Sequence, residues 1–138
     1  MSLTMFDLTG RRALITGSSQ GIGLALAKGL TAAGAEVVLN GRDLSKLEAA
    51  ATEVPGSRVL AFDVTDAKGT RDAIDGFEAE AGPIHILVNN AGMQHRAPLE
   101  DFPEDAFQRL LQTNIASVFH AGQACARHMI RRGAGKII

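Results

Sequence analysis

Short apolar runs alternate along this chain with longer segments of helical periodicity, and this alternation constrains the fold more than any other feature. The apolar runs, each short enough for a buried strand, are residues 12–16, 35–40, 58–62 and 85–89. The segments that predict helices between and after them are residues 21–33, 43–54, 66–81 and 103–132. Strands that alternate with helices indicate a parallel sheet with right-handed crossovers and helices on both faces. The sequence therefore predicts an α/β, doubly wound parallel sheet.

The last residues of the chain continue this series. Lys136, Ile137 and Ile138 resemble the start of a fifth strand. We expect residues 1–138 to be one nucleotide-binding domain, interrupted in its fifth strand, that is the N-terminal part of a longer single-domain protein.

Composition and charge exclude several other classes of protein. The chain has 14 Lys and Arg against 15 Asp and Glu, a formal net charge of -1, which favours neither nucleic acid nor an anionic membrane as a partner. No apolar run reaches membrane-spanning length, and the first residues lack the pattern of a signal peptide. With Cys125 as its one cysteine the chain cannot form an internal disulfide, and its histidines show no metal-ligand spacing with that residue. We therefore expect a cytoplasmic protein without a metal site.

A glycine-rich turn, residues 16–23, follows the first strand and opens the first helix. Glycines at such a turn let the backbone bend tightly and approach a pyrophosphate closely, while free N–H groups of the helix start point at the phosphates. No Lys-Ser or Lys-Thr pair follows the last glycine, so the turn is not a P-loop. A turn that only solves packing is the alternative. The residues that we expect to bind a nucleotide here are Gly17, Ser19, Gln20, Gly21, Ile22 and Gly23.

Two motifs, each at the expected place in the series, resemble those of one family. Residues 16–23 read Thr-Gly-x-x-x-Gly-Ile-Gly, which is similar to the cofactor signature of short-chain dehydrogenases/reductases. Residues 89–92 read Asn-Asn-Ala-Gly and resemble the second signature of that family. The resemblance covers nearly the whole chain and implies a Rossmann-type, NAD(P)-dependent oxidoreductase.

The second signature lies at the carboxyl end of the fourth strand, where open α/β sheets bind ligands. Short amides there can hydrogen-bond a neighbouring strand or a ribose, and we expect both, with Asn89 more structural and with Asn90, Ala91 and Gly92 near the cofactor. The alternative is that these side-chain amides only tie strand ends together.

The end of the second strand favours NADP over NAD as the cofactor. A ribose-binding acid is expected about 20 residues after the glycine turn, and the resemblance places it at Gly41, which has no carboxylate to repel a 2′-phosphate. The guanidinium of Arg42 matches a phosphate, and Asn40 can add a donor. In the alternative, Arg42 is an exposed arginine at a helix start and Asp43 is the ribose acid, although Asp43 suits a helix N-cap better.

Asp63 and Val64 follow the third strand. The resemblance implies that Asp63 binds the adenine amino group and that Val64 packs beside the adenine ring. The alternative for Asp63 is that it stabilises the turn into the next helix.

Asn114 lies on the broad apolar face of the long helix. A buried amide on such a face needs a partner, or costs about 1–3 kcal/mol. The resemblance implies a catalytic role for Asn114, holding a water molecule in a proton relay, whereas an Asn satisfied by a packing neighbour is the alternative. The family's Ser, Tyr and Lys are expected beyond Ile138, and this chain contains no Tyr. We therefore expect the chain by itself to be inactive.

His95 and Arg96 follow the second signature and are our candidates for contact with a small-molecule substrate. Arg96 can pair with a carboxylate, although a solvated loop arginine is an equal alternative. Residues 39–43 and 89–96 resemble the gluconate-oxidising members of the family most, which implies interconversion of a sugar acid such as gluconate with its ketone, 5-ketogluconate. A 3-oxoacyl-acyl-carrier-protein ketoreductase and a non-catalytic NADP-binding module are the alternatives.

The helix predicted at residues 103–132 is apolar over more than one stripe. Ile115 and Phe119 lie off the line through Leu111, Val118 and Cys125. A helix with such a wide apolar arc must bury two faces. One face can pack on the sheet, and we expect the other to join a second copy, as the dimers and tetramers of the resembled family imply.

Overall fold

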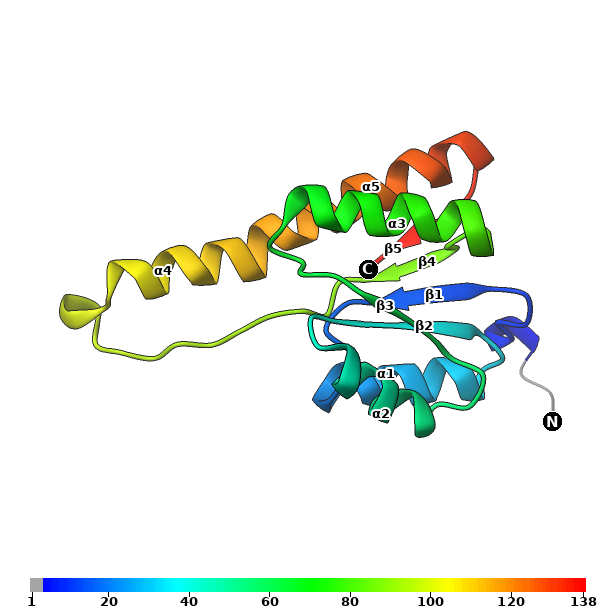
Figure 1. Ribbon diagram of the computed structural model, residues 1–138, viewed down its shortest axis with the longest axis horizontal. Coiled ribbons are helices and arrows are strands. Elements are labelled where there is room, and N and C mark those ends of the chain that lie inside the picture. Colours follow the sequence, from blue (N-terminus) through cyan, green and yellow to red (C-terminus); the bar gives the residue numbers. More distant parts are fainter. Residues whose placement is uncertain (1–3) are drawn as a thin grey trace.

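The computed structural model describes residues 4–138, and a five-stranded parallel sheet forms its centre (Figure 1). The strands are β1 (Arg12–Ile15), β2 (Glu36–Gly41), β3 (Arg58–Ala61), β4 (Ile86–Val88) and β5 (Lys136–Ile137). They lie in the order β3-β2-β1-β4-β5, and each neighbouring pair is parallel. The predicted doubly wound α/β fold is confirmed. Residues 1–3, which the predicted domain includes, lie outside the described residues.

Helices cover both faces of this sheet. Figure 1 shows α1 (Gly21–Ala32) and α2 (Leu44–Thr52) on one face and α3 (Ala67–Ala81) and α5 (Ser117–Arg132) on the other. Single 3-10 turns at Thr4–Phe6 and Leu99–Asp101 were not predicted. In the described part of the chain, no helix combines the length and apolar character needed to cross a bilayer.

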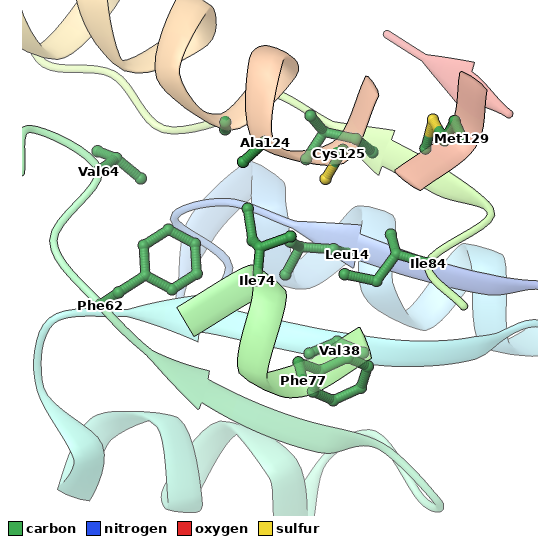
Figure 2. Close-up of a cluster of buried hydrophobic side chains, with 12 residues drawn as sticks. Leu14, Val38, Phe62, Val64, Ile74, Phe77, Ile84, Ala124, Cys125 and Met129 are labelled. Atoms are coloured by element: carbon green, nitrogen blue, oxygen red, sulfur yellow. The ribbon is translucent and has the colours of Figure 1, made fainter. Parts of the chain in front are cut away.

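The core consists of two apolar clusters, one on each face of the sheet. Successive strand residues point to opposite faces, so Leu14 of β1 packs toward α3 and α5 while Ile15 packs toward α1 and α2. Figure 2 shows side chains of α3 and α5 gathered around the sheet residues Leu14 and Val38. Burial on both faces explains why the strands read as continuous apolar runs.

Cys125 of α5 belongs to the cluster between α3, α5 and the sheet (Figure 2). Its burial raises the pKa of the thiol to about 12. A thiol that stays protonated at neutral pH is a poor nucleophile, so the residue serves as a small core side chain.

The long helix differs from its prediction. It consists of α4 (Glu104–Leu111), a π-helical turn (Gln112–Ala116) and α5, which follow one another without a break. Figure 1 shows that α5 lies over the sheet beside α3, whereas α4 projects beyond the carboxyl ends of the strands. Large apolar side chains of the long helix between residues 107 and 118 remain 37–63% exposed, and they are Phe107, Leu111, Ile115 and Val118. Apolar periodicity identified the helix, but it did not predict how much of the helix packs against the sheet.

Candidate functional site

A cavity of about 850 Å³ opens at the carboxyl ends of β1, β2 and β4. The strand order reverses direction at β1 and β4, which is the place where open α/β sheets bind ligands. Its volume falls in the range of small-molecule and cofactor sites. The predicted site residues that line it are Gly17, Ser19, Gln20, Gly21, Ile22, Gly23, Asn40, Arg42, Asp63, Asn90, Ala91 and Gly92.

The glycine turn after β1 needs its glycines for two different reasons. Gly17 and Gly21 have φ of 61° and 60°, in the left-handed region that side chains disfavour. Gly23 is required by space, because a Cβ there would lie 2.5 Å from Nδ2 of Asn90 and 2.6 Å from the carbonyl oxygen of Gly17. At Gly21, by contrast, a Cβ would meet no described atom within 4 Å, so the turn is open on the cavity side.

The N-terminus of α1 is prepared for an anion. Asp43 caps α2 by accepting from the backbone N–H of Lys46 at 3.2 Å, which confirms its predicted N-cap role, and Asp66 caps α3 in the same way. At α1, the N-cap residue Gln20 makes no side-chain hydrogen bond to the helix. The first N–H groups of a helix have no acceptor within it, and here they border the cavity. A pyrophosphate fits this position by charge and by hydrogen bonding.

Asn40 has a different role from the one predicted. Its side chain is buried, with Oδ1 accepting from the backbone N–H of Gly17 at 3.1 Å. Nδ2 donates to the carbonyl oxygens of Leu60 at 3.1 Å and Phe62 at 3.2 Å. The expectation that this amide donates to a 2′-phosphate does not fit the structure, because both of its hydrogens are used by the backbone. Asn40 instead ties the glycine turn to β3.

Asn90 also carries structural bonds, although it lines the cavity as predicted. Its Nδ2 donates to the carbonyl oxygens of Thr16 and Gly17, each at 3.0 Å. In return, Oγ1 of Thr16 accepts from the backbone N–H groups of Asn90 and Ala91. The two sequence motifs are thus one hydrogen-bonded unit, and the structural role expected of Asn89 is performed by Asn90.

Arg42 and Asp63 face each other at the end of β2. Arg42 is exposed, and its Nη1 lies 4.0 Å from Oδ2 of Asp63. Oδ1 of Asp63 accepts from the backbone N–H and the hydroxyl of Thr65, at 2.9 and 2.7 Å. Burial acts to raise the pKa of Asp63, but the Thr65 hydrogen bonds and the Arg42 charge outweigh it and hold this pKa below its ordinary value. Asp63 therefore stabilises its own turn, as the alternative reading expected, and presents an ionised acceptor to the cavity.

Three predicted residues are not brought to the cavity. Val64 packs into the core cluster with Phe62, so its expected place beside an adenine ring does not fit. His95 and Arg96 lie on the exposed segment between β4 and α4. The ring of His95 packs edge-on against Phe102, with 5.3 Å between the ring centroids.

Asn114 lies in the π-helical turn and is exposed, contrary to its prediction as a buried amide. Its Oδ1 accepts from the backbone N–H of Met93 at 2.8 Å, and its Nδ2 donates to the carbonyl oxygen of the same residue at 3.0 Å. The amide is therefore satisfied by a loop that follows the second motif. This two-point contact fixes the loop beside Gly92, where a Cβ would lie 3.2 Å from Oδ1 of Asn114.

Sequence reasoning missed several residues that line the cavity. Those with polar side chains include Lys46, Thr65, Arg109, Gln112 and Thr113. Some of these positions could have been found from the sequence. Lys46 lies one helical turn after the predicted cap Asp43, and Gln112 and Thr113 directly precede the predicted Asn114. The described residues contain no group of three His, Cys, Asp or Glu side chains able to hold a metal ion.

Comparison with known proteins decides the family. The model of the short chain dehydrogenase family matches residues 11–138. The chain belongs to this family. The predicted membership of this family is confirmed, and so is the prediction that the chain resembles its gluconate-oxidising members most.

Relatives with assigned activities match almost the whole of this chain. The chain is 52% identical to gluconate 5-dehydrogenase of Gluconobacter oxydans and 40% identical to 5-keto-D-gluconate 5-reductase of Escherichia coli, with 97% of the chain and 54% of each relative covered. A crystal structure of a gluconate 5-dehydrogenase from Burkholderia cenocepacia, in complex with NADP and tartrate, matches with a TM-score of 0.92 and 51% identity. That match covers 96% of this chain and 53% of the other. The chain thus spans about half the length of the relatives it matches.

Two glycines of α1 form a matched pair for testing the packing of the glycine turn. We expect Gly23→Ala to lower the free energy of unfolding by about 1–3 kcal/mol, since its Cβ would overlap backbone atoms that must move. We expect Gly29→Ala to raise it by up to about 1 kcal/mol, because a Cβ there meets open space and alanine favours the helix. Denaturant unfolding of both variants measures the difference, and equal effects would contradict this account of Gly23.

Proposed function

We propose that the whole protein is an NADP-dependent dehydrogenase that interconverts a secondary alcohol and a ketone on a sugar acid such as gluconate. The observation that carries the proposal is the cavity, in which a glycine turn and an uncapped helix N-terminus meet a strand that ends at Gly41 and is followed by Arg42. The substrate class is supported by the similarity to gluconate 5-dehydrogenase and 5-keto-D-gluconate 5-reductase and by the NADP and tartrate in the Burkholderia cenocepacia structure.

In this proposal residues 1–138 bind and orient the cofactor. The N–H groups at the start of α1 hold the pyrophosphate, while Asp63 accepts from the adenine amino group. Asn90, Ala91 and Gly92 border the cofactor from the other side of the glycine turn. Bound NADP supplies the acceptor for the hydride that leaves the alcohol carbon. Arg96 stays our candidate for a substrate carboxylate, held on the exposed loop before α4.

The preference for NADP rests on the charge at the end of β2. Gly41 places no carboxylate there, and Arg42 offers an exposed guanidinium to a 2′-phosphate. Lys46 lines the same part of the cavity and adds to the positive charge. NAD lacks the 2′-phosphate and would gain nothing from these cations.

We expect Arg42→Ala to reduce the NADPH-to-NADH affinity ratio by roughly tenfold or more, because a charge-assisted hydrogen bond is lost. Gly41→Asp should reduce it further by repelling the 2′-phosphate, and the position accepts a side chain, since its Cβ would meet Leu47 only at 3.5 Å. Fluorescence titration with both cofactors measures the ratio, and the affinity for NADPH should also fall with salt.

Arg71→Ala is the control, since it removes an exposed charge from α3, away from the cavity. A ratio that Arg42→Ala leaves unchanged would show that the 2′-phosphate is bound elsewhere.

We propose that the general acid/base is a Tyr outside residues 1–138, as the family resemblance implies, since the chain itself contains no Tyr. Asn114 is our candidate for supporting the path of that proton, from a turn fixed against Met93.

We expect the whole protein to oxidise gluconate with NADP, and Asn114→Ala to lower kcat by roughly tenfold or more while cofactor affinity stays nearly intact. Steady-state kinetics and cofactor titration separate the two quantities. The 138-residue chain alone should show no turnover. Turnover by that chain would contradict the proposal that the general acid/base lies outside it, and a folded Asn114→Ala enzyme with normal kcat would contradict the role of Asn114. Cofactor binding without any turnover by the whole protein would favour a non-catalytic module.

We also propose that the whole protein is a homo-oligomer joined through residues 103–132, and that it acts in the cytoplasm, where NADP is available. Ile115 of the π-helical turn and Phe119 at the start of α5 are 63% and 62% exposed. Neighbouring large apolar side chains left in water favour association.

Light scattering should give a dimer or tetramer at micromolar concentration. Exchange of Ile115 and Phe119 for Glu should dissociate it, because charges would then have to be buried. Leu99→Glu, at an exposed apolar residue just before this helix, is the control and should leave the mass unchanged. A monomeric wild type would overturn the proposal.

A further inference from the structure

The π-helical turn contacts two loops of the cavity at once. Gln112 at its start donates from Nε2 to the carbonyl oxygen of Thr65 at 2.9 Å, across 47 residues of sequence. Asn114, two residues later, holds both backbone polar groups of Met93. Residues two apart point to nearly opposite sides of a helix. The turn therefore lies between the loop after β3 and the loop after β4 and is bonded to each of them.

The loop after β3 is the one that orients Asp63. Thr65 donates its backbone N–H and its hydroxyl to Oδ1 of Asp63, so these two donors are directed back into the turn. Its carbonyl oxygen is left to accept from Gln112. The other oxygen of Asp63 lies 4.0 Å from Nη1 of Arg42. A continuous set of contacts thus leads from the π-helical turn to the residues at the end of β2.

We propose that Gln112 is a positioning residue for the adenosine half of the cofactor, acting through Thr65 and Asp63. This inference rests on the proposed function, since it takes a dinucleotide to occupy the cavity. Without the donor of Gln112 the Thr65 turn keeps its local bonds and the buried Val64, but it loses its hydrogen bond to the long helix, and Asp63 becomes more mobile. Ligand binding must then order the turn, which weakens affinity.

The exposure of this contact distinguishes positioning from a purely structural role. Gln112 and the carbonyl of Thr65 are accessible to solvent, so water can satisfy both groups when the bond is lost. The fold therefore loses little stability on substitution. A water molecule does not hold the Thr65 turn at a fixed distance from the helix, so the ligand-binding geometry is what suffers.

The test measures affinity in the whole protein with Gln112→Met, which keeps the length of the side chain and removes its donor. The probes are NADPH and adenosine 2′,5′-bisphosphate, which carries only the adenosine half. We expect both dissociation constants to rise by the same factor, roughly three- to tenfold, as the loss of one hydrogen bond implies. The melting temperature should change little.

Gln108→Met is the matched control. Gln108 lies one turn earlier on the same helix, and its amide donates to Glu104 of that helix. It should leave both affinities unchanged. Gln112→Glu is the second variant if Gln112→Met does not fold, because its carboxylate has similar size and cannot donate to the Thr65 carbonyl.

A double-mutant comparison tests the route through Asp63. In an Asp63→Ala background, Gln112→Met should no longer weaken binding, because the side chain that it positions is gone. Unchanged affinity in Gln112→Met, or an undiminished loss in the Asp63→Ala background, would overturn the inference. A wild-type protein that binds neither probe would overturn the proposed function as well, whereas normal binding by wild type and variant alike refutes the role of Gln112 alone.

Discussion

Parallel strands that end together at one edge of a sheet leave their last backbone N–H and C=O groups without partners in the sheet. The geometry of the cavity depends on how these groups are hydrogen-bonded, and two asparagine side chains bond to them. Asn40 joins the N–H of Gly17 to the carbonyls that end β3, and Asn90 joins the carbonyls of Thr16 and Gly17 to the end of β4. Each such group left unpaired in the interior would cost about 1–3 kcal/mol. The three strand ends around the cavity are thereby fixed to one another.

With the strand ends fixed, the glycine turn has little freedom of its own. Gly23 brings α1 against Asn90 so closely that no side chain fits between them. The N–H groups at the start of α1 then face the cavity in a fixed direction, without the side-chain cap that α2 and α3 have. A missing cap costs a helix about 1 kcal/mol, and a bound anion offsets that cost. The fold thus keeps a small local instability at the place where we propose that a phosphate binds.

The projecting part of the long helix connects this site to the surface of the molecule. Its π-helical turn bonds to the loops after β3 and β4 on one side, while Ile115 exposes its apolar side chain. A contact between copies along this helix would therefore lie next to the turn that holds both loops. In the proposed oligomer, the contact between copies and the geometry of the cavity would depend on one structural element.

The sequence by itself determined the fold class, the family and the glycine turn that lines the cavity, because these depend on local patterns. Apolar runs, helical periodicity and glycines in a strand-to-helix turn act over a few residues, and they located each strand and helix to within a few residues. Asp43 as a helix cap was predicted for the same reason, since a cap bonds to its own helix.

Only the tertiary structure decided what each polar side chain binds. Asn40, Asn90 and Asn114 were all expected to serve ligand or chemistry. Asn40 and Asn90 donate both amide hydrogens, and Asn114 donates one, to backbone carbonyls brought from distant parts of the chain. Gln112 and the depth to which the long helix is covered were missed for the same reason. An amide can donate to any carbonyl within reach, and which carbonyl lies within reach is fixed by how the strands and helices pack, not by the neighbours of the residue in sequence.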